Sequence, residues 1–405
     1  MEKQQGQFDI LGDIRILDAA AWIAGTGAGA ILGDLGAEVI KIEDPVAGDT
    51  YRGMATAYGD IMSVKGRHIG FETANLNKKS ITLDLTKDEG REILYQLVAK
   101  SDIFHTNFLK KTREKLAITY DDLRVYNPKL IYCVTTGFGT HGPSAHRRAY
   151  DTTAQAQSGI MWEMGDRAYD EPFGVVGAFA MVCGLAGRDR LGIGQEVHVS
   201  MLGSALHIQS QNVNMALLRG RPYGRFCRKK SPNPMSNNYR CRDGKWLMLA
   251  EPVSDRYWWE FCDVLGLPIL RDKVDFSTSA GRKQHCTELI EIIGKTFASK
   301  DRDEWIKIFE GKSAGFGYAP IYDLSEAISD PQAIENEYIT DFNHPVLGPI
   351  SIRGFPFWFS KTPARIRSEA PEHGQHTEQV LIEILNYDWE QIGMLRAKGI
   401  ICREP

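Results

Sequence analysis

Several features that would assign the chain of 405 residues to a common class are missing. No apolar run approaches the roughly 20 residues that span a bilayer. The polar start MEKQQGQFDILGD has no apolar secretion-signal segment. The net charge of -4 provides no basic field for nucleic acid or an anionic membrane. The sequence therefore predicts a cytoplasmic protein with no nucleic-acid or membrane partner, in which local charge must meet any anionic ligand.

Motifs for metal and nucleotide chemistry are also missing. The seven cysteines include no C-x-x-C pair, so we expect reduced, mostly buried thiols and no metal site. The G-x-x-x-x-G-K-[ST] pattern of ATP-binding loops does not occur. The sequence therefore shows no ATP-binding loop of this type.

What is present in the first half is an alternation of strand and helix patterns. Apolar, strand-like runs alternate with helix-like runs; the strand-like runs are IRILDAA, AEVIKIE, KSITLDL, SDIFHTNF and KLIYCVTTGFG. This alternation predicts an α/β fold with a parallel sheet. Small or polar residues follow several of these strands, which is where doubly wound folds bind their ligands.

The length of the chain exceeds what one hydrophobic core usually supports, so we expect the second half to form a smaller second domain. A basic stretch rich in Pro, Asn and Gly separates the two halves and predicts a linker. Beyond it, KWLMLAE resembles a strand, and an irregular stretch at 343–371 precedes a helix-like tail. The patterns thus predict an α/β domain in the first half, a linker at 217–238 and a smaller α/β domain beyond it.

A glycine motif near the start raises the question of dinucleotide binding. Gly25-x-Gly27-x-x-Ala30, followed by a strand that ends in Glu43, is nearly the NAD or FAD fingerprint. The fingerprint needs its first glycine at the end of the strand, whereas the predicted strand ends near Ala20 and leaves AWIA before Gly25. Glycines that pack a first helix, from about Gly27 onwards, are therefore favoured, and an NAD- or FAD-dependent oxidoreductase is a distant alternative.

Motifs along nearly the whole chain resemble those of the family III CoA-transferases, the family of formyl-CoA and carnitine CoA-transferases. They are GAEVIKIEDP, LNKKSITLDLTKDEGREILYQLVAKSDIFHTNF, NPKLIYCVTTGFGTHGP, RRAYDTTAQAQSG, GIGQEVHVSM and HPVLGPISIRGFPFWFSKTPARIRSEAPEHGQHTEQVL. The resemblance implies a large Rossmann-like domain at 1–216, a linker at 217–238, a small α/β domain at 239–330, and a return to the large domain at 331–405. It further implies two subunits interlocked like links of a chain. It also implies an aspartate nucleophile that passes acyl and CoA groups through an anhydride and an aspartyl-CoA thioester, with CoA and acyl-CoA as substrates and no permanently bound cofactor.

The resemblance places the nucleophile before a helix rich in small residues. Counting back 25 positions from Gln195 of LGIGQ reaches Asp170, with Gly174 where the family has a glycine. An alternative alignment with a gap puts Met181 there, and a methionine cannot do this chemistry. In a third interpretation, Asp166 and Asp170 are solvated or helix-capping acids of an ordinary loop.

Residues that the resemblance implies for CoA binding follow two strands and one helix. They are Trp22, Ile23, Ala24, Asn107, Phe108, Lys115 and Leu116. Lys115 corresponds to a phosphate-binding cation of relatives, and Lys110, Lys111 and Arg113 add local charge or form a plain basic helix face. The run 227–232 is interpreted as a solvated linker, with an approach to CoA phosphate from a partner subunit as the alternative.

A further acid, Asp151, precedes a helix pattern in YDTTAQAQSG. An aspartate in this position accepts hydrogen bonds from unpaired N–H groups at the start of the helix. We therefore favour capping over catalysis for Asp151.

Departures from the family pattern cluster at the same site and suggest a second hypothesis. The chain has Thr26 where relatives commonly have proline, and Leu109, Lys110 and Lys111 where they have x-Pro-Gly. The chain is therefore either a working CoA-transferase subunit, in a homodimer or heterodimer, or the silent partner subunit of a heteromeric enzyme. Benzylsuccinate CoA-transferase is the two-subunit example that we name. Its substrates would be a CoA thioester and a carboxylic acid.

Overall fold

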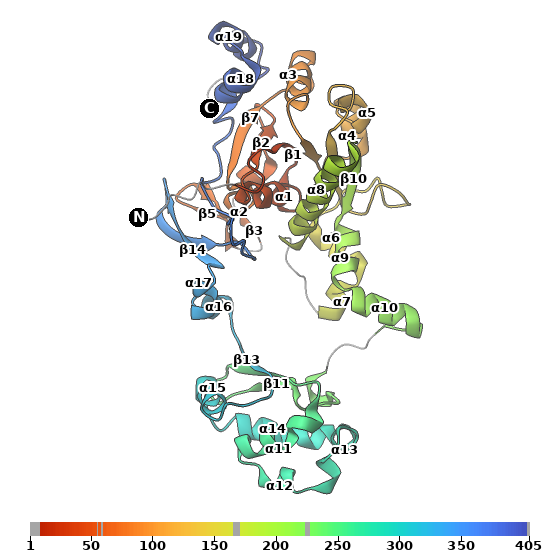
Figure 1. The fold of residues 1–405 in the computed structure, drawn as a ribbon, viewed down its shortest axis with the longest axis vertical. Helices are drawn as coiled ribbons and strands as arrows, with labels where there is room; N and C mark the ends of the chain where they lie inside the picture. Colours follow the sequence, from red (N-terminus) through yellow and green to blue (C-terminus); the bar gives the residue numbers. More distant parts are fainter. Residues whose placement is uncertain (1–8, 55, 58–59, 165–170, 223–226, 403–405) are drawn as a thin grey trace. The chain divides into compact units, whose positions relative to one another are not determined.

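The computed structural model describes residues 9–54, 56–57, 60–164, 171–222 and 227–402 (Figure 1). Contacts within the chain divide it into two compact units. The larger unit comprises 1–223 and 337–405, and the smaller unit comprises 224–336. The small domain was expected at 239–330, so the smaller unit begins inside the segment that was expected to be a linker.

A six-stranded parallel sheet forms the centre of the larger unit. Its strand order is β10-β9-β8-β1-β2-β7. The strands are β1 (Arg15–Ala19), β2 (Glu38–Glu43), β7 (Lys78–Thr82), β8 (Ile103–Thr106), β9 (Ile131–Thr136) and β10 (Gln195–Ser200). The α/β class with a parallel sheet, predicted from the sequence, is confirmed.

The order of these strands reverses between β1 and β8. In chain order the strands lie as 6-5-4-1-2-3, which is the doubly wound Rossmann order. Leu17 of β1 pairs with Ile40 of β2 on one side and with Phe104 of β8 on the other. Ligands of such sheets bind beyond the carboxyl ends of the two strands at this switch point. The fold thus places the candidate site where β1 and β8 end.

Apolar residues on both faces of the sheet pack against helices. Ile16 contributes to the core under α1 (Trp22–Asp34) and α8 (Glu171–Leu191). The next residue, Leu17, contributes to the opposite core under α3 (Asp88–Val98), because successive side chains of a strand point to opposite faces. The C-terminal helices α18 (Thr377–Leu385) and α19 (Trp389–Ala397) cover the same face as α3. Residues far apart in the sequence therefore share one core.

Helix α1 begins earlier than predicted. The sequence suggested a start at Gly27, but the structure places the first residue at Trp22, so AWIA forms the connection and first turn. The glycines lie inside the helix, where Gly25 packs on Asn107 and Gly29 packs on Asp18 and Lys78. The packing interpretation of these glycines is confirmed. The start was misplaced because side chains distant in the sequence hold the first turn.

The remaining elements of the larger unit are short. They are η1 (Thr50–Gly53), β3 (Thr56–Ala57), β4 (Asp60–Ile61), β5 (Ser63–Val64), β6 (Arg67–His68), α2 (Ile69–Asn75), α4 (Lys110–Lys115), α5 (Tyr120–Leu123), α6 (Asp151–Ser158), α7 (Ile160–Met164), α9 (Met201–Ile208), α10 (Ser210–Arg219), β14 (Ile339–His344) and β15 (Gly348–Arg353). The stretch 343–371, expected to be irregular, in fact contains most of an antiparallel hairpin of β14 and β15.

The smaller unit is a three-stranded antiparallel sheet covered by helices, with an aromatic-rich core. The core includes Trp258, Phe261, Phe297 and Phe309. The strands are β11 (Ser236–Arg240), β12 (Trp246–Ala250) and β13 (Tyr318–Ile321). The helices are η2 (Arg228–Lys230), α11 (Ser254–Leu265), α12 (Pro268–Arg271), η3 (Val274–Phe276), α13 (Ser279–Gln284), α14 (Cys286–Phe297), α15 (Arg302–Gly311), α16 (Leu324–Ile328) and α17 (Pro331–Glu335).

Candidate functional site

Asn107 joins the two strand ends at the switch point. Its Oδ1 accepts a hydrogen bond from Ala21 N at 3.1 Å, and its Nδ2 donates to Ala21 O at 2.7 Å. A Cβ on Gly25 would lie 2.8 Å from Asn107 Nδ2, so glycine is required for this approach. The amide therefore brings the segment after β1 and the segment after β8 side by side, as the predicted CoA contacts require.

Trp22 has an unusual backbone and aromatic neighbours. Its φ of +63° lies in the left-handed region that non-glycine residues rarely adopt. The half-buried ring lies 5.4 Å from the Tyr51 ring and 5.3 Å, edge to face, from the Tyr150 ring. Ile23 packs with Trp22 against the cluster that contains Tyr51, whereas Ala24 packs against a second cluster. The three predicted contacts Trp22, Ile23 and Ala24 thus lie at the first turn of α1.

A buried set of charges lies beneath this turn. The Asp18 carboxylate accepts from Lys78 Nζ at 2.7 Å and contacts His105 Nδ1 at 3.1 Å, and the side chains of Asp18 and Lys78 are completely buried. Burial by itself would raise the pKa of Asp18, but the charge of Lys78 and the hydrogen bond of His105 hold it well below its usual range. Burial lowers the pKa of Lys78 to about 8, against the opposing effect of Asp18. Lys78 also donates to Thr26 O at 2.7 Å, so this ion pair anchors α1.

A second buried pair lies beside the first. Lys41 Nζ donates to Asp49 Oδ2 at 2.8 Å and to Ala20 O at 2.9 Å. Glu43 Oε2 accepts from Asp49 N at 2.9 Å, and the same carboxylate pairs with Arg52. Burial would raise the pKa of Glu43, but Arg52 and Lys41 outweigh it and lower this pKa to about 2. Sequence reasoning missed Asp49 and Lys41 because the partners of their side chains lie on other elements.

The predicted contacts after β8 separate into buried and exposed positions. Phe108 and Leu116 pack, partly buried, against the core under α3. Lys115 is exposed at the last position of α4. Arg113, expected to add surface charge, is instead buried, with Nη1 3.5 Å from Tyr132 Oη and 3.7 Å from a Glu196 oxygen. The surface of α4 therefore carries lysines, and the phosphate contact of Lys115 stays a prediction.

The predicted nucleophile Asp170 lies outside the described residues. The next residue in the sequence begins α8, whose Phe173 is buried in the same cluster against which Ala24 packs. Gly174 contacts the backbone of Gly27 in α1. The first turns of α1 and α8 are therefore neighbours. Met181, the position reached by the alternative alignment, is buried in the apolar core between α8 and the sheet.

Asp151 lies one position further into its helix than expected. It is the first residue of α6, and Tyr150 is the residue before the helix. Its Oδ2 accepts from Gln155 Nε2, one turn along, at 3.0 Å. A carboxylate in the first turn stabilises a helix through the dipole. Asp151 therefore interacts with its own helix from the first turn rather than from the N-cap position.

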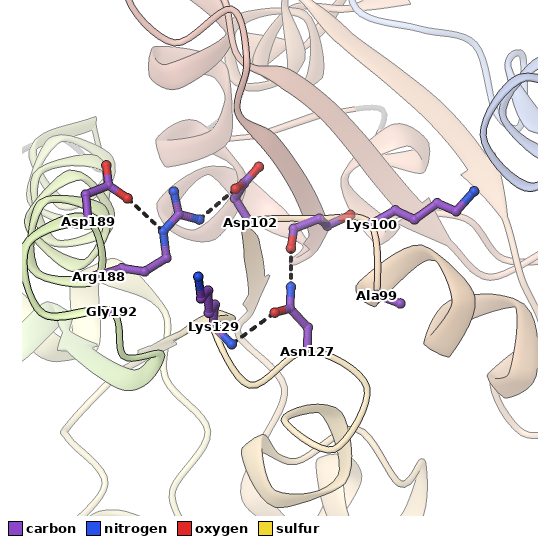
Figure 2. Close-up of a pocket in the computed structure, with 9 residues that line it drawn as sticks. Ala99, Lys100, Asp102, Asn127, Lys129, Arg188, Asp189 and Gly192 are labelled. Atoms are coloured by element: carbon purple, nitrogen blue, oxygen red, sulfur yellow. Dashed lines mark hydrogen bonds and ion pairs between the residues drawn. The ribbon is translucent and has the colours of Figure 1, made fainter.

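A cavity of about 550 Å³ lies at the opposite edge of the sheet (Figure 2). Its lining includes Asp102 just before β8 and Lys129 before β9, so it adjoins the amino ends of these strands. Figure 2 shows Arg188 between Asp102 and Asp189, at 2.6 Å and 3.0 Å. Because ligands of doubly wound sheets bind beyond the carboxyl ends, this cavity is separate from the candidate site.

The described residues hold no group of three or more His, Cys, Asp or Glu that could bind a metal ion. Across the same ranges, no helix is both long and apolar enough to cross a membrane. All seven cysteines are free. Cys133, Cys241, Cys262 and Cys402 are buried, whereas Cys183 and Cys227 are exposed. The prediction of reduced, mostly buried thiols therefore agrees with the structure for most of them.

Comparison with known proteins identifies the family. The family model described as CoA-transferase family III matches residues 11–377. The chain belongs to this family. As an enzyme of the family III type, it transfers CoA between acids, which removes the dinucleotide-dependent oxidoreductase from consideration.

Individual relatives match this chain along nearly their whole length. This family III CoA-transferase is 32% identical over 401 residues to succinyl-CoA:glutarate CoA-transferase of Mus musculus, covering 96% of this chain and 90% of that protein. It is 28% identical over 413 residues to the succinyl-CoA–L-malate CoA-transferase beta subunit of Chloroflexus aurantiacus, covering 96% and 98%. The crystal structure of a CaiB/BaiF family protein from Brucella suis matches with a TM-score of 0.81 at 26% identity, covering 93% of this chain and 100% of that one.

Proposed function

We propose that this family III CoA-transferase moves CoA from a donor thioester to an acceptor carboxylic acid through covalent intermediates on Asp170. The observation that carries the proposal is the packing of Phe173, three positions after Asp170, in the cluster that also contacts Ala24 at the switch point. Ala24 belongs to the segment that would contact CoA. The first turn of α8, which follows Asp170 directly in the sequence, therefore lies beside the segment that would contact CoA.

The proposed reaction is a double exchange. The Asp170 carboxylate attacks the thioester carbonyl and the C–S bond breaks. CoA thiolate departs, and a mixed anhydride of Asp170 and the donor acid is formed. The thiolate then attacks the aspartyl carbonyl, so that the donor acid is released and an aspartyl-CoA thioester remains. The acceptor carboxylate attacks this thioester, which releases CoA thiolate and forms a mixed anhydride of Asp170 and the acceptor acid. The thiolate then attacks the acceptor carbonyl of this anhydride, which forms the new acyl-CoA and releases the Asp170 carboxylate. Overall, one thioester and one free carboxylate are exchanged for another thioester and another carboxylate, so no ATP and no redox cofactor are consumed.

Succinyl-CoA is the donor that we propose. Two relatives named above use succinyl-CoA with a dicarboxylic acceptor, glutarate or L-malate. Benzylsuccinate is also a dicarboxylate and carries an aromatic ring, for which Trp22 and Tyr150 offer aromatic neighbours. An acceptor panel of glutarate, L-malate and benzylsuccinate therefore tests the substrate. The cytosolic location stays a prediction from the sequence.

We propose further that two subunits associate, as the resemblance implies for interlocked subunits. The larger unit exposes large apolar side chains on the consecutive, contacting helices α8, α9 and α10, with exposed fractions of 69% for Phe179, 52% for Ile208 and 75% for Leu217. Exposed apolar residues that cluster on neighbouring elements commonly mark a protein interface. Native mass of the purified protein tests this. A monomeric mass at micromolar concentration would contradict it.

Trapping of the aspartyl intermediate tests the reaction. After incubation with succinyl-CoA, hydroxylamine should convert Asp170 to a hydroxamate that peptide mass spectrometry detects. Asp170→Asn should abolish both the label and CoA exchange, and Asp166→Asn in the same segment is the matched control. Full exchange by Asp170→Asn would contradict this nucleophile.

The silent-subunit hypothesis is the second candidate. The departures at Thr26 and at Lys110 and Lys111 favour it, and a relative is named as one subunit of its enzyme. In the structure, however, Thr26 fits its position, because Oγ1 donates to Trp22 O at 2.5 Å inside α1. Absence of the hydroxamate, together with co-purification of a related second chain, would support the silent subunit.

A further inference from the structure

Helix α1 begins without a cap of its own. The residue before it, Ala21, has no side-chain acceptor, and the first turn contains no acidic residue. The first N–H groups of a helix need an acceptor outside the helix. Asp49, 27 positions after Trp22, supplies one, because its Oδ1 accepts from Trp22 N at 3.4 Å.

The same oxygen caps a second element. Asp49 Oδ1 also accepts from Tyr51 N at 2.9 Å and so begins η1. One oxygen atom therefore holds the two backbone segments that carry the rings of Trp22 and Tyr51. These rings lie 5.4 Å apart, and the ring of His68 packs 4.7 Å from the Tyr51 ring.

Asp49 itself is held firmly. Its Oδ2 accepts from Lys41 Nζ at 2.8 Å, and only 2% of its side chain is exposed, against 0% for Lys41. Its own N–H donates to Glu43 at 2.9 Å. Lys41 and Glu43 both belong to β2 of the sheet. The Asp49 carboxylate therefore has a defined position before any ligand binds.

We propose that Asp49 is a positioning residue for CoA recognition, which caps α1 from a distance and sets the Trp22 ring, supported from beneath by the buried Tyr51 ring, as a preformed apolar platform. This inference rests on the proposed function, because CoA is the ligand assigned to the switch point. Trp22 has a left-handed φ, which is unfavourable for residues other than glycine, so this segment needs an external anchor. A platform that is ordered before binding avoids the entropy cost of ordering it on binding.

Two double variants separate the effect of the hydrogen-bond acceptor at position 49 from the effect of the Asp49 charge. Lys41→Met with Asp49→Asn removes both charges but keeps a side-chain oxygen at position 49. Lys41→Met with Asp49→Leu also removes both charges and offers no acceptor. Because loss of a cap corresponds to a factor of about fivefold to tenfold, the Leu variant should bind CoA that much more weakly than the Asn variant. KM for the acid acceptor should be the same in both, which a general loss of structure would not produce.

Equal CoA dissociation constants for the two folded variants, measured by calorimetry, would overturn the proposal. If the Leu variant does not fold, hydrogen exchange of the wild-type protein decides instead. The Trp22 amide should exchange slowly without CoA, and rapid exchange that slows only when CoA is added would contradict a preformed platform. A wild-type protein that binds no CoA would contradict the proposed function, while slow exchange of Trp22 would still support the cap.

Discussion

Gly27 of α1 and Gly174 of α8 approach so closely that a Cβ on Gly174 would lie 3.3 Å from the carbonyl carbon of Gly27. The backbones of the two helices touch here, within the first two turns of each. This crossing determines where α8 begins relative to the segment that follows β1.

Gly174→Ala should therefore slow the reaction more than it destabilises the fold. The added methyl group must displace α8 by a few tenths of an ångström, and misplacement of reacting groups on this scale is expected to lower kcat by about tenfold. Steady-state kinetics at saturating succinyl-CoA measures this. Gly187→Ala on the same helix is the control, because its Cβ would meet only the end of the Gln195 side chain, at 3.2 Å. Equal kcat values for the two variants would contradict the role of the crossing.

Asn107→Ala should weaken CoA binding and lower the free energy of unfolding. It leaves the N–H and C=O groups of Ala21 without their partner, which costs about 1–3 kcal/mol for buried groups. Asn127→Ala is a matched control at the other edge of the sheet. The Asn127 side chain likewise bonds to the backbone, donating to Ser101 O at 2.7 Å and to Val98 O at 3.3 Å and accepting from Lys129 N at 3.0 Å (Figure 2). It should lose similar stability in urea but keep its CoA dissociation constant; weakened CoA binding in both variants would contradict a specific role for Asn107.

Lys78→Met should be among the most destabilising single changes in the larger unit. It leaves the buried Asp18 carboxylate without its cation, and breaking a buried ion pair typically costs about 3–5 kcal/mol. The double variant Asp18→Asn with Lys78→Met should recover at least half of this loss, because Asn can still accept from Ala20 N and pair with His105. Chemical denaturation measures both. A double variant no more stable than Lys78→Met would show that the buried charge is not the cause.

Glu43 should contribute to acid unfolding. Its pKa in the folded protein is about 2, below the ordinary value of 4.5, so the unfolded chain binds a proton first as the pH falls. The stabilisation is thus fully present above about pH 4.5 and is lost as the pH falls towards 2, by on the order of 3 kcal/mol. Glu43→Gln should flatten the stability profile in this window, and Glu92→Gln at an exposed position of α3 should leave it unchanged. A Glu43→Gln profile as steep as that of the wild type would contradict this.

Local patterns in the sequence were sufficient for the sheet and for the helices that cover it. Apolar runs such as AEVIKIE and KSITLDL correspond to β2 and β7, and the apolar residues Ile93, Leu94, Leu97 and Val98 recur at helical spacing and form the buried face of α3. Such patterns can be read directly because one buried face imposes its period on consecutive residues. The alternation of strands and helices likewise predicted the fold class, whereas the CoA contacts that the family motifs suggest after β1 and β8 stay predictions.

The start of α1, the hairpin of β14 and β15, and the anchoring of Trp22 were decided only by the tertiary structure. Each depends on a side chain or strand brought from a distant part of the chain, as Asp49 is brought to Trp22 and Asn107 to Ala21. The buried pairs Asp18–Lys78 and Lys41–Asp49 have the same origin. A charge in the sequence does not reveal whether it will be solvated or buried beside an opposite charge. That outcome depends on which strands are neighbours in the sheet. In this protein β1 lies between β2 and β8, and the strand order reverses between β1 and β8.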